Sequence, residues 1–204
     1  MAWLNRFGWL IGPKNTEAKV VIIGLVNSGK STIMQQLKPR DITMTKLTPN
    51  IPIGMTAERF VFKTLTFVAF DLEDIQNGFG NPWEDHYRDC HGVIFVVDSA
   101  DRMNTPLVRI QLDKMLRNPL MEKRHEIPIL ILANKTDQPG AVPSLQLAQL
   151  LELSHLNRPW HIVCSDGLTG EGLNEAMDWL AHRLRAICCK YPHPTLQAIN
   201  NYAH

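Results

Sequence analysis

The chain has 204 residues, a formal net charge of +1 and 45% hydrophobic content. This composition fits one well-packed domain, and 21 basic against 20 acidic residues argue against a nucleic-acid partner and against a disordered acidic chain. The four cysteines form no C-x-x-C pair, which favours a reducing cytosol. No apolar run is long enough to cross a membrane, and Asn5 and Arg6 interrupt the apolar amino terminus, so we expect neither a membrane span nor a signal peptide.

Strands and helices alternate along the chain. Strand patterns cover residues 18–23, 58–63, 65–70, 93–97, 127–132 and 160–163. Helical periodicity covers residues 30–37, 107–116, 144–151 and 173–186. The second and third strands form a predicted hairpin around Lys63 and Thr64. The pattern predicts an α/β fold with a mainly parallel six-stranded sheet, helices on both faces and one antiparallel edge strand. Ligand loops then belong at the carboxyl ends of the strands.

A glycine-rich loop joins the first strand to the first helix. Its sequence, GLVNSGKS from Gly24 to Ser31, matches the G-x-x-x-x-G-K-[ST] pattern of P-loop NTPases. Backbone N–H groups and the helix start can surround a phosphate, Lys30 can reach the terminal phosphates, and the Ser31 hydroxyl can bind Mg²⁺. The alternative is a glycine-rich turn that matches by accident. The candidate phosphate-binding residues are Gly24, Asn27, Ser28, Gly29, Lys30, Ser31 and Thr32.

Two loops downstream are candidates for guanine recognition. The strand at residues 127–132 leads into Asn134, Lys135, Thr136 and Asp137. A carboxylate at Asp137 can accept both the N1–H and the N2 amine of guanine, a donor pair that adenine lacks. Asn134 can hold the loop, and the stem of Lys135 can cover the flat face of the base. Alone, N-K-x-D is more often a surface turn, but here it follows a buried strand and a phosphate loop.

The following strand ends at Cys164 and Ser165, where a backbone N–H is expected to reach the guanine O6 atom. This expectation is less specific than the others, because any residue supplies an amide.

With these motifs, the chain resembles the ADP-ribosylation-factor-like group of Ras-superfamily GTPases. The resemblance covers about residues 1–186 and rests on GLVNSGKST, WEDHYRDCHGVIFVVDSADR, IPILILANKTD and PWHIVCSDGLTGEGL. The combination of IGMTAERF, WEDHY and RPWHIVCSDGLTGEGLNEAMDWL is most similar to the branch of the group that recruits the BBSome coat to ciliary membranes. The resemblance implies GTP or GDP with Mg²⁺ as cofactors, and a BBSome-like coat or cargo adaptor as effector.

The second switch segment departs from the family pattern D-x-x-G-Q. Asp71 matches the first position of this pattern. The resemblance implies that this residue holds Mg²⁺ through a water molecule. Asp74 replaces the glycine whose N–H meets the γ-phosphate, and Ile75 replaces the glutamine that orients the attacking water. Gln76, one position later, is a candidate shifted substitute. The Asp74 carboxylate either repels the γ-phosphate or points to solvent.

The first switch segment departs as well. Where the family reads P-T-I-G, this chain reads Ile51-Pro52-Ile53-Gly54. Pro52 has neither the hydroxyl that binds Mg²⁺ nor the N–H that meets the γ-phosphate. We therefore expect a guanine-nucleotide binder with weak GTP preference and very low hydrolysis, which recruits a coat or adaptor. The alternative is a nucleotide-insensitive scaffold.

The two termini are predicted to lie outside the GTPase domain, which spans residues 17–187. Residues 1–16 are expected to form an amphipathic helix, with residues 3–11 contacting a membrane peripherally; the alternative is that its apolar face packs permanently on the domain. Ala2 excludes myristoylation by the M-G rule. Membrane attachment could also use acylation of Cys188 or Cys189, although that pair is more simply inert. Residues 188–204 are expected to be a mobile extension. The expected localisation is cytoplasmic and membrane-peripheral, with the base of the cilium or flagellum as a candidate site.

Overall fold

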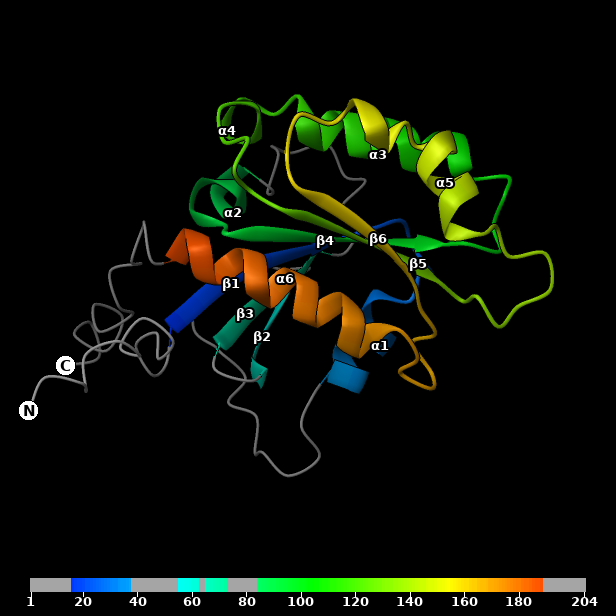
Figure 1. Ribbon diagram of the computed structural model, residues 1–204, viewed down its shortest axis with the longest axis horizontal. Helices are drawn as coiled ribbons and strands as arrows, with labels where there is room; N and C mark the ends of the chain where they lie inside the picture. Colours follow the sequence, from blue (N-terminus) through cyan, green and yellow to red (C-terminus); the bar gives the residue numbers. More distant parts are fainter. Residues whose placement is uncertain (1–15, 38–54, 63–64, 73–83, 189–204) are drawn as a thin grey trace, which may run out of the picture.

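The computed structural model describes residues 16–37, 55–62, 65–72 and 84–188 (Figure 1). The switch positions Pro52, Asp74, Ile75 and Gln76 lie outside the described residues, as do both proposed terminal segments. The described elements run from Thr16 to Cys188.

A six-stranded sheet forms the centre of the molecule, with strand order β2-β3-β1-β4-β5-β6. Only β2 is antiparallel to its neighbour, so the predicted α/β architecture with one antiparallel edge strand is confirmed. The strands are β1 (Thr16–Ile23), β2 (Met55–Phe62), β3 (Leu65–Leu72), β4 (Gly92–Asp98), β5 (Ile129–Asn134) and β6 (Trp160–Cys164).

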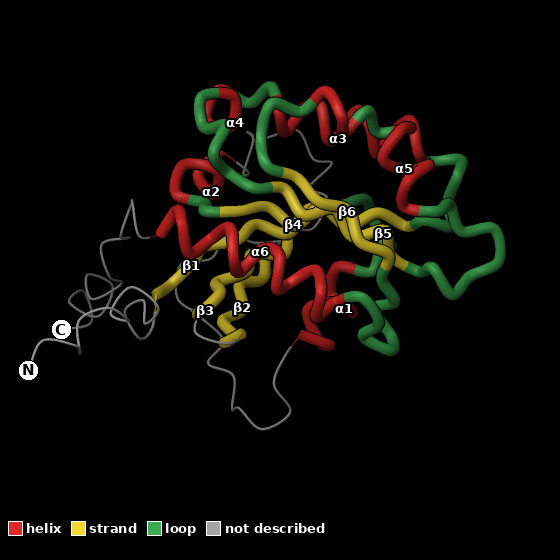
Figure 2. Tube along the Cα trace, viewed as in Figure 1, coloured by secondary structure: helices red, strands yellow, loops and turns green. Residues whose placement is uncertain are grey.

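Helices cover both faces of this sheet (Figure 2). One face carries α2 (Glu84–Asp89), α3 (Thr105–Leu116), α4 (Pro119–Glu122) and α5 (Ser144–Leu150), and the other carries α1 (Lys30–Leu37) and α6 (Leu173–Cys188). The short elements α2, α4 and the 3₁₀ turn η1 (Leu153–His155) are additional to the helices that periodicity predicts. None of the helices within the described ranges is long and apolar enough to traverse a bilayer.

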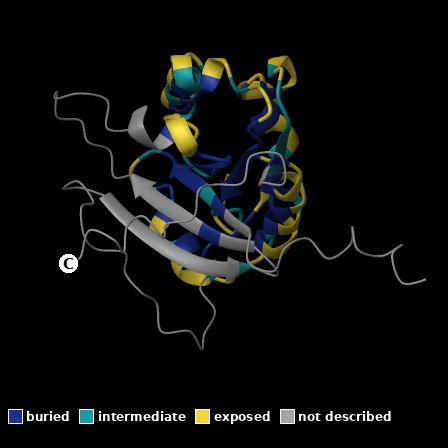
Figure 3. Ribbon diagram, turned by 90° about the vertical axis from the view of Figure 1, so that its left-hand side faces the viewer, coloured by how far each residue is buried: buried dark blue, intermediate teal, exposed yellow. Residues whose placement is uncertain are grey.

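Alternation along the strands divides the core into two layers. Val21 and Ile23 pack toward α3 and α5, whereas Val20 and Ile22 pack toward α1 and α6. Because side chains alternate with a period of two, a strand covered on both faces must be apolar along its length, as β4 and β5 are up to their last residues, Asp98 and Asn134. Figure 3 shows the central strands as buried and the outer surfaces of the helices as exposed.

The strand β5 lies two residues later than the predicted range of 127–132. Pro128 has no N–H to donate to the ladder, and the Ile127 N–H bonds to Arg124 O in a turn. At the other end, the Asn134 carbonyl accepts a hydrogen bond from the Ser99 N–H, which keeps Asn134 within the sheet. The shift matters because it places Asn134, the first residue of the N-K-T-D sequence, in the last position of a buried strand.

Candidate functional site

The glycine-rich loop follows β1 and leads directly into α1. The Ser28 N–H bonds to Leu25 O at 3.2 Å, and the first helical hydrogen bond runs from the Ile33 N–H to Gly29 O at 2.9 Å. The first four N–H groups of a helix have no acceptor within the helix, so they face the loop as donors. Asn27 and Gly29 have φ values of 63° and 97°, a left-handed backbone that turns successive N–H groups toward one side.

Close approach of neighbouring segments explains the two glycines of this loop. A Cβ atom at Gly29 would lie 2.2 Å from Asn134 Nδ2, and one at Gly24 would lie 2.2 Å from Val96 O. The loop therefore packs directly against the ends of β4 and β5, and no larger residue fits at either position.

The Lys30 side chain is buried beneath this loop. Its Nζ atom donates to Gly24 O at 2.9 Å and to Leu25 O at 3.1 Å. A lysine ammonium has three N–H donors, so these two bonds fix the charge under the loop and leave one donor for an anion. This arrangement fits a phosphate in the loop.

Asn134 connects three segments that are far apart in the sequence. Its side chain is 2% exposed; Nδ2 donates to Ser28 O at 2.8 Å, and Oδ1 accepts from the Gly167 N–H at 2.9 Å. The phosphate loop, the N-K-T-D loop and the loop after β6 are thus joined through one amide group. The sequence predicts a loop-holding role for Asn134, and Gly167 is a partner that the sequence does not indicate.

Lys135 and Thr136 are held in equally specific positions. Lys135 has a φ of 62°, and its Nζ lies 2.7 Å from Asp98 Oδ2 at the end of β4. The Thr136 hydroxyl donates to Ser165 O at 3.1 Å, which ties the N-K-T-D loop to the loop after β6. Asp137, by contrast, is exposed, so its carboxylate is free to meet a base at the surface of the site.

The loop after β6 contains Cys164 and Ser165. The Ser165 N–H bonds to Ala133 O at 2.8 Å, so this amide is already committed to the sheet and is not free for guanine O6. Cys164 is exposed. Any base contact from this loop would therefore come from another amide, a distinction that the sequence pattern does not make because every residue carries an N–H.

Asp166 shapes the same loop. It accepts hydrogen bonds from the Thr169 hydroxyl at 2.7 Å and from the Leu168 N–H at 2.8 Å. These two bonds, with that from Thr169 the stronger influence, lower the pKa of the Asp166 carboxyl below its usual range. Asp166 therefore stabilises the loop as a carboxylate.

Two buried hydroxyl groups at the site lack a partner within the described residues. They are Ser28 Oγ in the phosphate loop and Ser165 Oγ beside the N-K-T-D loop, and the two residues are 2% and 0% exposed. Buried polar atoms are ordinarily paired, so both indicate that a ligand or ordered water completes this region. The residues present therefore fit a bound nucleotide.

Ser31 and Asp71 also fit a magnesium ion that binds together with the phosphates of a nucleotide. Ser31 is in the first turn of α1, and the register pairs Asp71 in β3 with Ile22, two residues before the phosphate loop. Within the described ranges no three His, Cys, Asp or Glu side chains gather to form a metal cage. Mg²⁺ needs no such cage, because it usually binds one or two protein groups together with phosphates and water.

The sheet order, the loop after β1 and the N-K-T-D loop define a P-loop nucleotide-binding protein of the small-GTPase class. The family model for the ADP-ribosylation factor family matches residues 7–184, and the chain belongs to that family.

Several relatives share most of their length with this chain. It is 40% identical over 181 residues to ADP-ribosylation factor-like protein 6 of Danio rerio, covering 88% of this chain and 95% of the relative. It is 36% identical over 167 residues to ADP-ribosylation factor-like protein 1 of Saccharomyces cerevisiae, covering 81% and 87%. The solved structure of the Arl6 BBS3 small GTPase from Trypanosoma brucei, with bound nucleotide analogue GppNp, is similar with a TM-score of 0.72 and 34% identity. That match covers 83% of this chain and 98% of the solved one.

Proposed function

We propose that the described site binds the guanosine diphosphate part of GTP and GDP. The observation that carries this proposal is the Asn134 bridge, which joins the phosphate loop to the two base loops. Lys30 and the N–H groups at the start of α1 would meet the phosphates, while Asp137 would accept from the guanine edge. Bound Mg²⁺ would supply charge neutralisation between the phosphates; the Ser31 hydroxyl would hold it directly, and Asp71 through water.

We further propose that recognition of the third phosphate is weak. The proposal rests on residue chemistry, since Pro52 offers neither hydroxyl nor N–H where the family uses both. Asp74 places a carboxylate where the family has a glycine; at about 5 Å and an effective dielectric near 20, one such charge pair costs roughly 3 kcal/mol. Ile75 cannot orient an attacking water, and Gln76 is the residue that could replace it.

The resulting function is an Arf-like guanine-nucleotide-binding protein that recruits a coat or cargo adaptor, with very low GTP hydrolysis. Similarity to proteins named ADP-ribosylation factor-like protein 6 supports this role over a metabolic one. Residues 1–16 would contact the cytoplasmic face of a membrane through their apolar stripe, and residues 188–204 would extend from the domain. A BBSome-like coat at the base of a cilium is the effector that the resemblance favours.

A nucleotide-insensitive scaffold is the second candidate. It is favoured because the substitutions fall at the positions that contact the γ-phosphate in the family. Without those contacts GTP and GDP would bind the same conformations equally well, and a ligand with equal affinity for two conformations does not shift the equilibrium between them. In that case bound nucleotide would stabilise the fold and the effector surface would stay constant.

Single-turnover GTP hydrolysis tests the proposal. We expect the wild-type rate to fall about a hundredfold or more below that of a relative with intact switches, since each lost polar contact in the transition state is worth roughly 2–4 kcal/mol. Pro52→Thr combined with Asp74→Gly and Ile75→Gln should raise the rate. Hydrolysis by the unaltered chain at the relative's rate would contradict the proposal, and Lys30→Ala serves as the binding-deficient control.

A further inference from the structure

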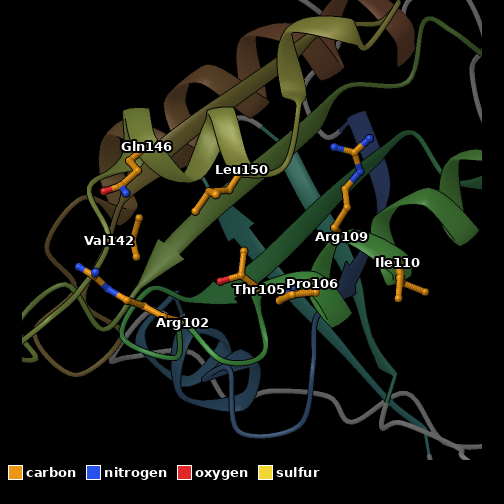
Figure 4. A pocket seen from close by; sticks show the side chains of 8 residues that line it. All are labelled: Arg102, Thr105, Pro106, Arg109, Ile110, Val142, Gln146 and Leu150. Carbon is orange, nitrogen blue, oxygen red and sulfur yellow. The ribbon is translucent and has the colours of Figure 1, made fainter.

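An apolar groove lies between α3 and α5, on the face of the sheet opposite α1 and α6 (Figure 4). Its volume is about 500 Å³. The apolar lining comes from Pro106, Ile110, Val142 and Leu150, and the charged lining comes from Arg102 and Arg109. None of these residues belongs to the nucleotide site.

Polar contacts fix the two walls of the groove at both ends. At one end Arg102 Nε donates to Gly140 O at 3.0 Å, and the Val142 N–H donates to Ser99 O at 2.7 Å. At the other end an Arg109 guanidinium N–H donates to Glu152 Oε2 at 2.7 Å. The segments that precede the two helices are therefore joined to each other, and α3 is joined through Arg109 to the residue Glu152 that follows α5, while an apolar surface remains between the helices.

The apolar surface extends beyond the groove onto the outer faces of both helices. Leu107 and Ile110 on α3 are 50% and 51% exposed, and Leu145 and Leu150 on α5 are 73% and 47% exposed. Small-molecule sites enclose most of their ligand, whereas a patch this open over two helices is typical of a protein-binding surface. On α3 the apolar residues Leu107 and Ile110 form a seam along one line of the helix, and Lys114 places a cation at the end of that seam, at the spacing i, i+3, i+7.

Charged side chains on α3 and in the segments around it indicate which kind of partner this surface would bind. Arg109 pairs with two carboxylates, Asp113 and Glu152, and the neutral Asn104 amide donates to the Asp101 carboxylate, which keeps its negative charge. Across the described part of the chain, no carboxylate lies within ion-pair distance of Arg102, Lys114 or Arg117. The surface thus offers an apolar seam with unpaired cations at its edges. A second copy of this chain docked through the same face by two-fold symmetry would bring its own unpaired Arg102, Lys114 and Arg117 against this face.

We propose that the α3–α5 groove is a docking surface for an amphipathic α-helix of a partner protein, with acidic residues flanking its apolar stripe. The partner helix inserts apolar side chains between Ile110 and Leu150 and places carboxylates near Arg102 and Lys114. The 12 residues of α3 span about 18 Å, which accommodates roughly three turns of an opposing helix. Because the groove lies outside the nucleotide site, this docking does not depend on the proposed nucleotide chemistry.

The test measures fluorescence anisotropy of two synthetic helical peptides with the full chain. Both peptides carry leucines at heptad positions; one has glutamates at the flanking positions and the other has lysines. We expect the glutamate peptide to bind in the micromolar range and the lysine peptide at least about tenfold more weakly. Ile110→Asp and Leu150→Asp should each weaken the glutamate peptide at least about tenfold, and Arg102→Glu should remove most of the preference between peptides.

Leu168→Asp is the matched control, because Leu168 is 76% exposed but lies in the loop after β6. It should leave peptide binding unchanged, and circular dichroism should show every variant folded. Equal binding of the two peptides, no binding of either, or binding that Ile110→Asp leaves intact would each overturn the proposal. A dimer in sedimentation that Ile110→Asp dissociates would assign the face to a second copy and would also overturn it.

Discussion

At the scale of single residues, Asn134 organises the site. Its buried side-chain amide donates a hydrogen bond to the phosphate loop and accepts one from the loop after β6. A lysine in the αL conformation follows it, and that lysine is held by Asp98 at the end of the neighbouring strand. Geometry at the site thus depends on a few polar side chains that no apolar contact could replace.

Asn134→Ala should destabilise the protein and weaken nucleotide binding together. The change leaves Ser28 O and the Gly167 N–H without their partner, and two unsatisfied buried groups cost about 2–4 kcal/mol in all. Urea denaturation with GDP titration measures both effects. The control is Asn118→Ala, which removes the cap on the Leu120 N–H, costs about 1 kcal/mol and should leave GDP affinity unchanged. Unchanged GDP affinity in Asn134→Ala would count against the bridging role.

Asp98→Asn should weaken GDP binding about ten- to a hundredfold without unfolding the protein. Asparagine can still accept from the Ala100 N–H, as Asp98 does, but it no longer attracts the Lys135 ammonium. A hydrogen bond between charged groups is worth about 1.5–3 kcal/mol, which sets the expected loss. The GDP dissociation rate, followed with a fluorescent analogue, gives the measurement. Asp113→Asn, which removes a carboxylate from Arg109 away from the site, should have no effect on that rate.

The candidate site could be predicted from the sequence where a motif assigns a side-chain role. GLVNSGKS and N-K-T-D locate Lys30, Asn134 and Asp137 correctly at the carboxyl ends of β1 and β5. The hydrogen-bond partners Asp98, Thr136 and Gly167 could not be assigned from local pattern, because each becomes significant only after strands distant in sequence align. The sequence gives one indication of Asp98 as a partner, because polar residues stand at the carboxyl end of β4, the strand next to β5.

At the scale of elements, the conformation of the loop after β6 is stabilised by one ionised carboxyl group, that of Asp166. The pKa of Asp166 is lowered in the folded protein, so its contribution to the free energy of unfolding is present above the ordinary value of about 4. That contribution is lost as the pH falls through the lower folded pKa. We therefore expect the stability of the wild type to fall more steeply than that of Asp166→Asn as the pH is lowered from about 5 to about 3.

Urea denaturation of wild type and Asp166→Asn across this pH range checks the expectation. The two stability curves should converge in acid. Parallel curves would show that the Thr169 and Leu168 contacts do not depend on the Asp166 charge. Glu171→Gln, an exposed neighbour in the same loop, is the control for a general loss of negative charge.

Long elements could be predicted from the sequence, whereas short elements could not. The helix at residues 30–37 has the predicted bounds, and the predicted antiparallel pairing of β2 with β3 is present, although β2 begins at Met55 and not at residue 58. The helix α4 has four residues, too few for a periodic pattern, and it depends on Asn118 capping and on burial of Met121. The start of β5 depends on hydrogen bonds around Pro128, which become visible only when the neighbouring strand is in place.

At the scale of the whole molecule, the domain carries two candidate binding surfaces that adjoin at Ser99, whose N–H donates to Asn134 O and whose carbonyl accepts from the Val142 N–H. The nucleotide loops gather at the carboxyl ends of the strands, and the α3–α5 groove lies over one face of the sheet. We expect substitutions in the groove to alter peptide docking while GDP affinity stays constant. Substitutions at Asn134 or Asp98 should show the opposite pattern. Ile110 and Leu150 lie on α3 and α5, outside the loops that share Ser99, so their substitution should act independently of the nucleotide site.

The central claim is that the site binds the guanosine diphosphate part of the nucleotide while the contacts to the third phosphate are lost. Its most direct test is the ratio of GDP to GTP-analogue dissociation constants in saturating Mg²⁺, measured for wild type and for Pro52→Thr with Asp74→Gly. We expect wild type to bind both nucleotides with affinities within about tenfold of each other, and the double substitution to raise the affinity for the triphosphate alone. A wild-type preference for the triphosphate of about a hundredfold or more, unchanged by the double substitution, would contradict the claim.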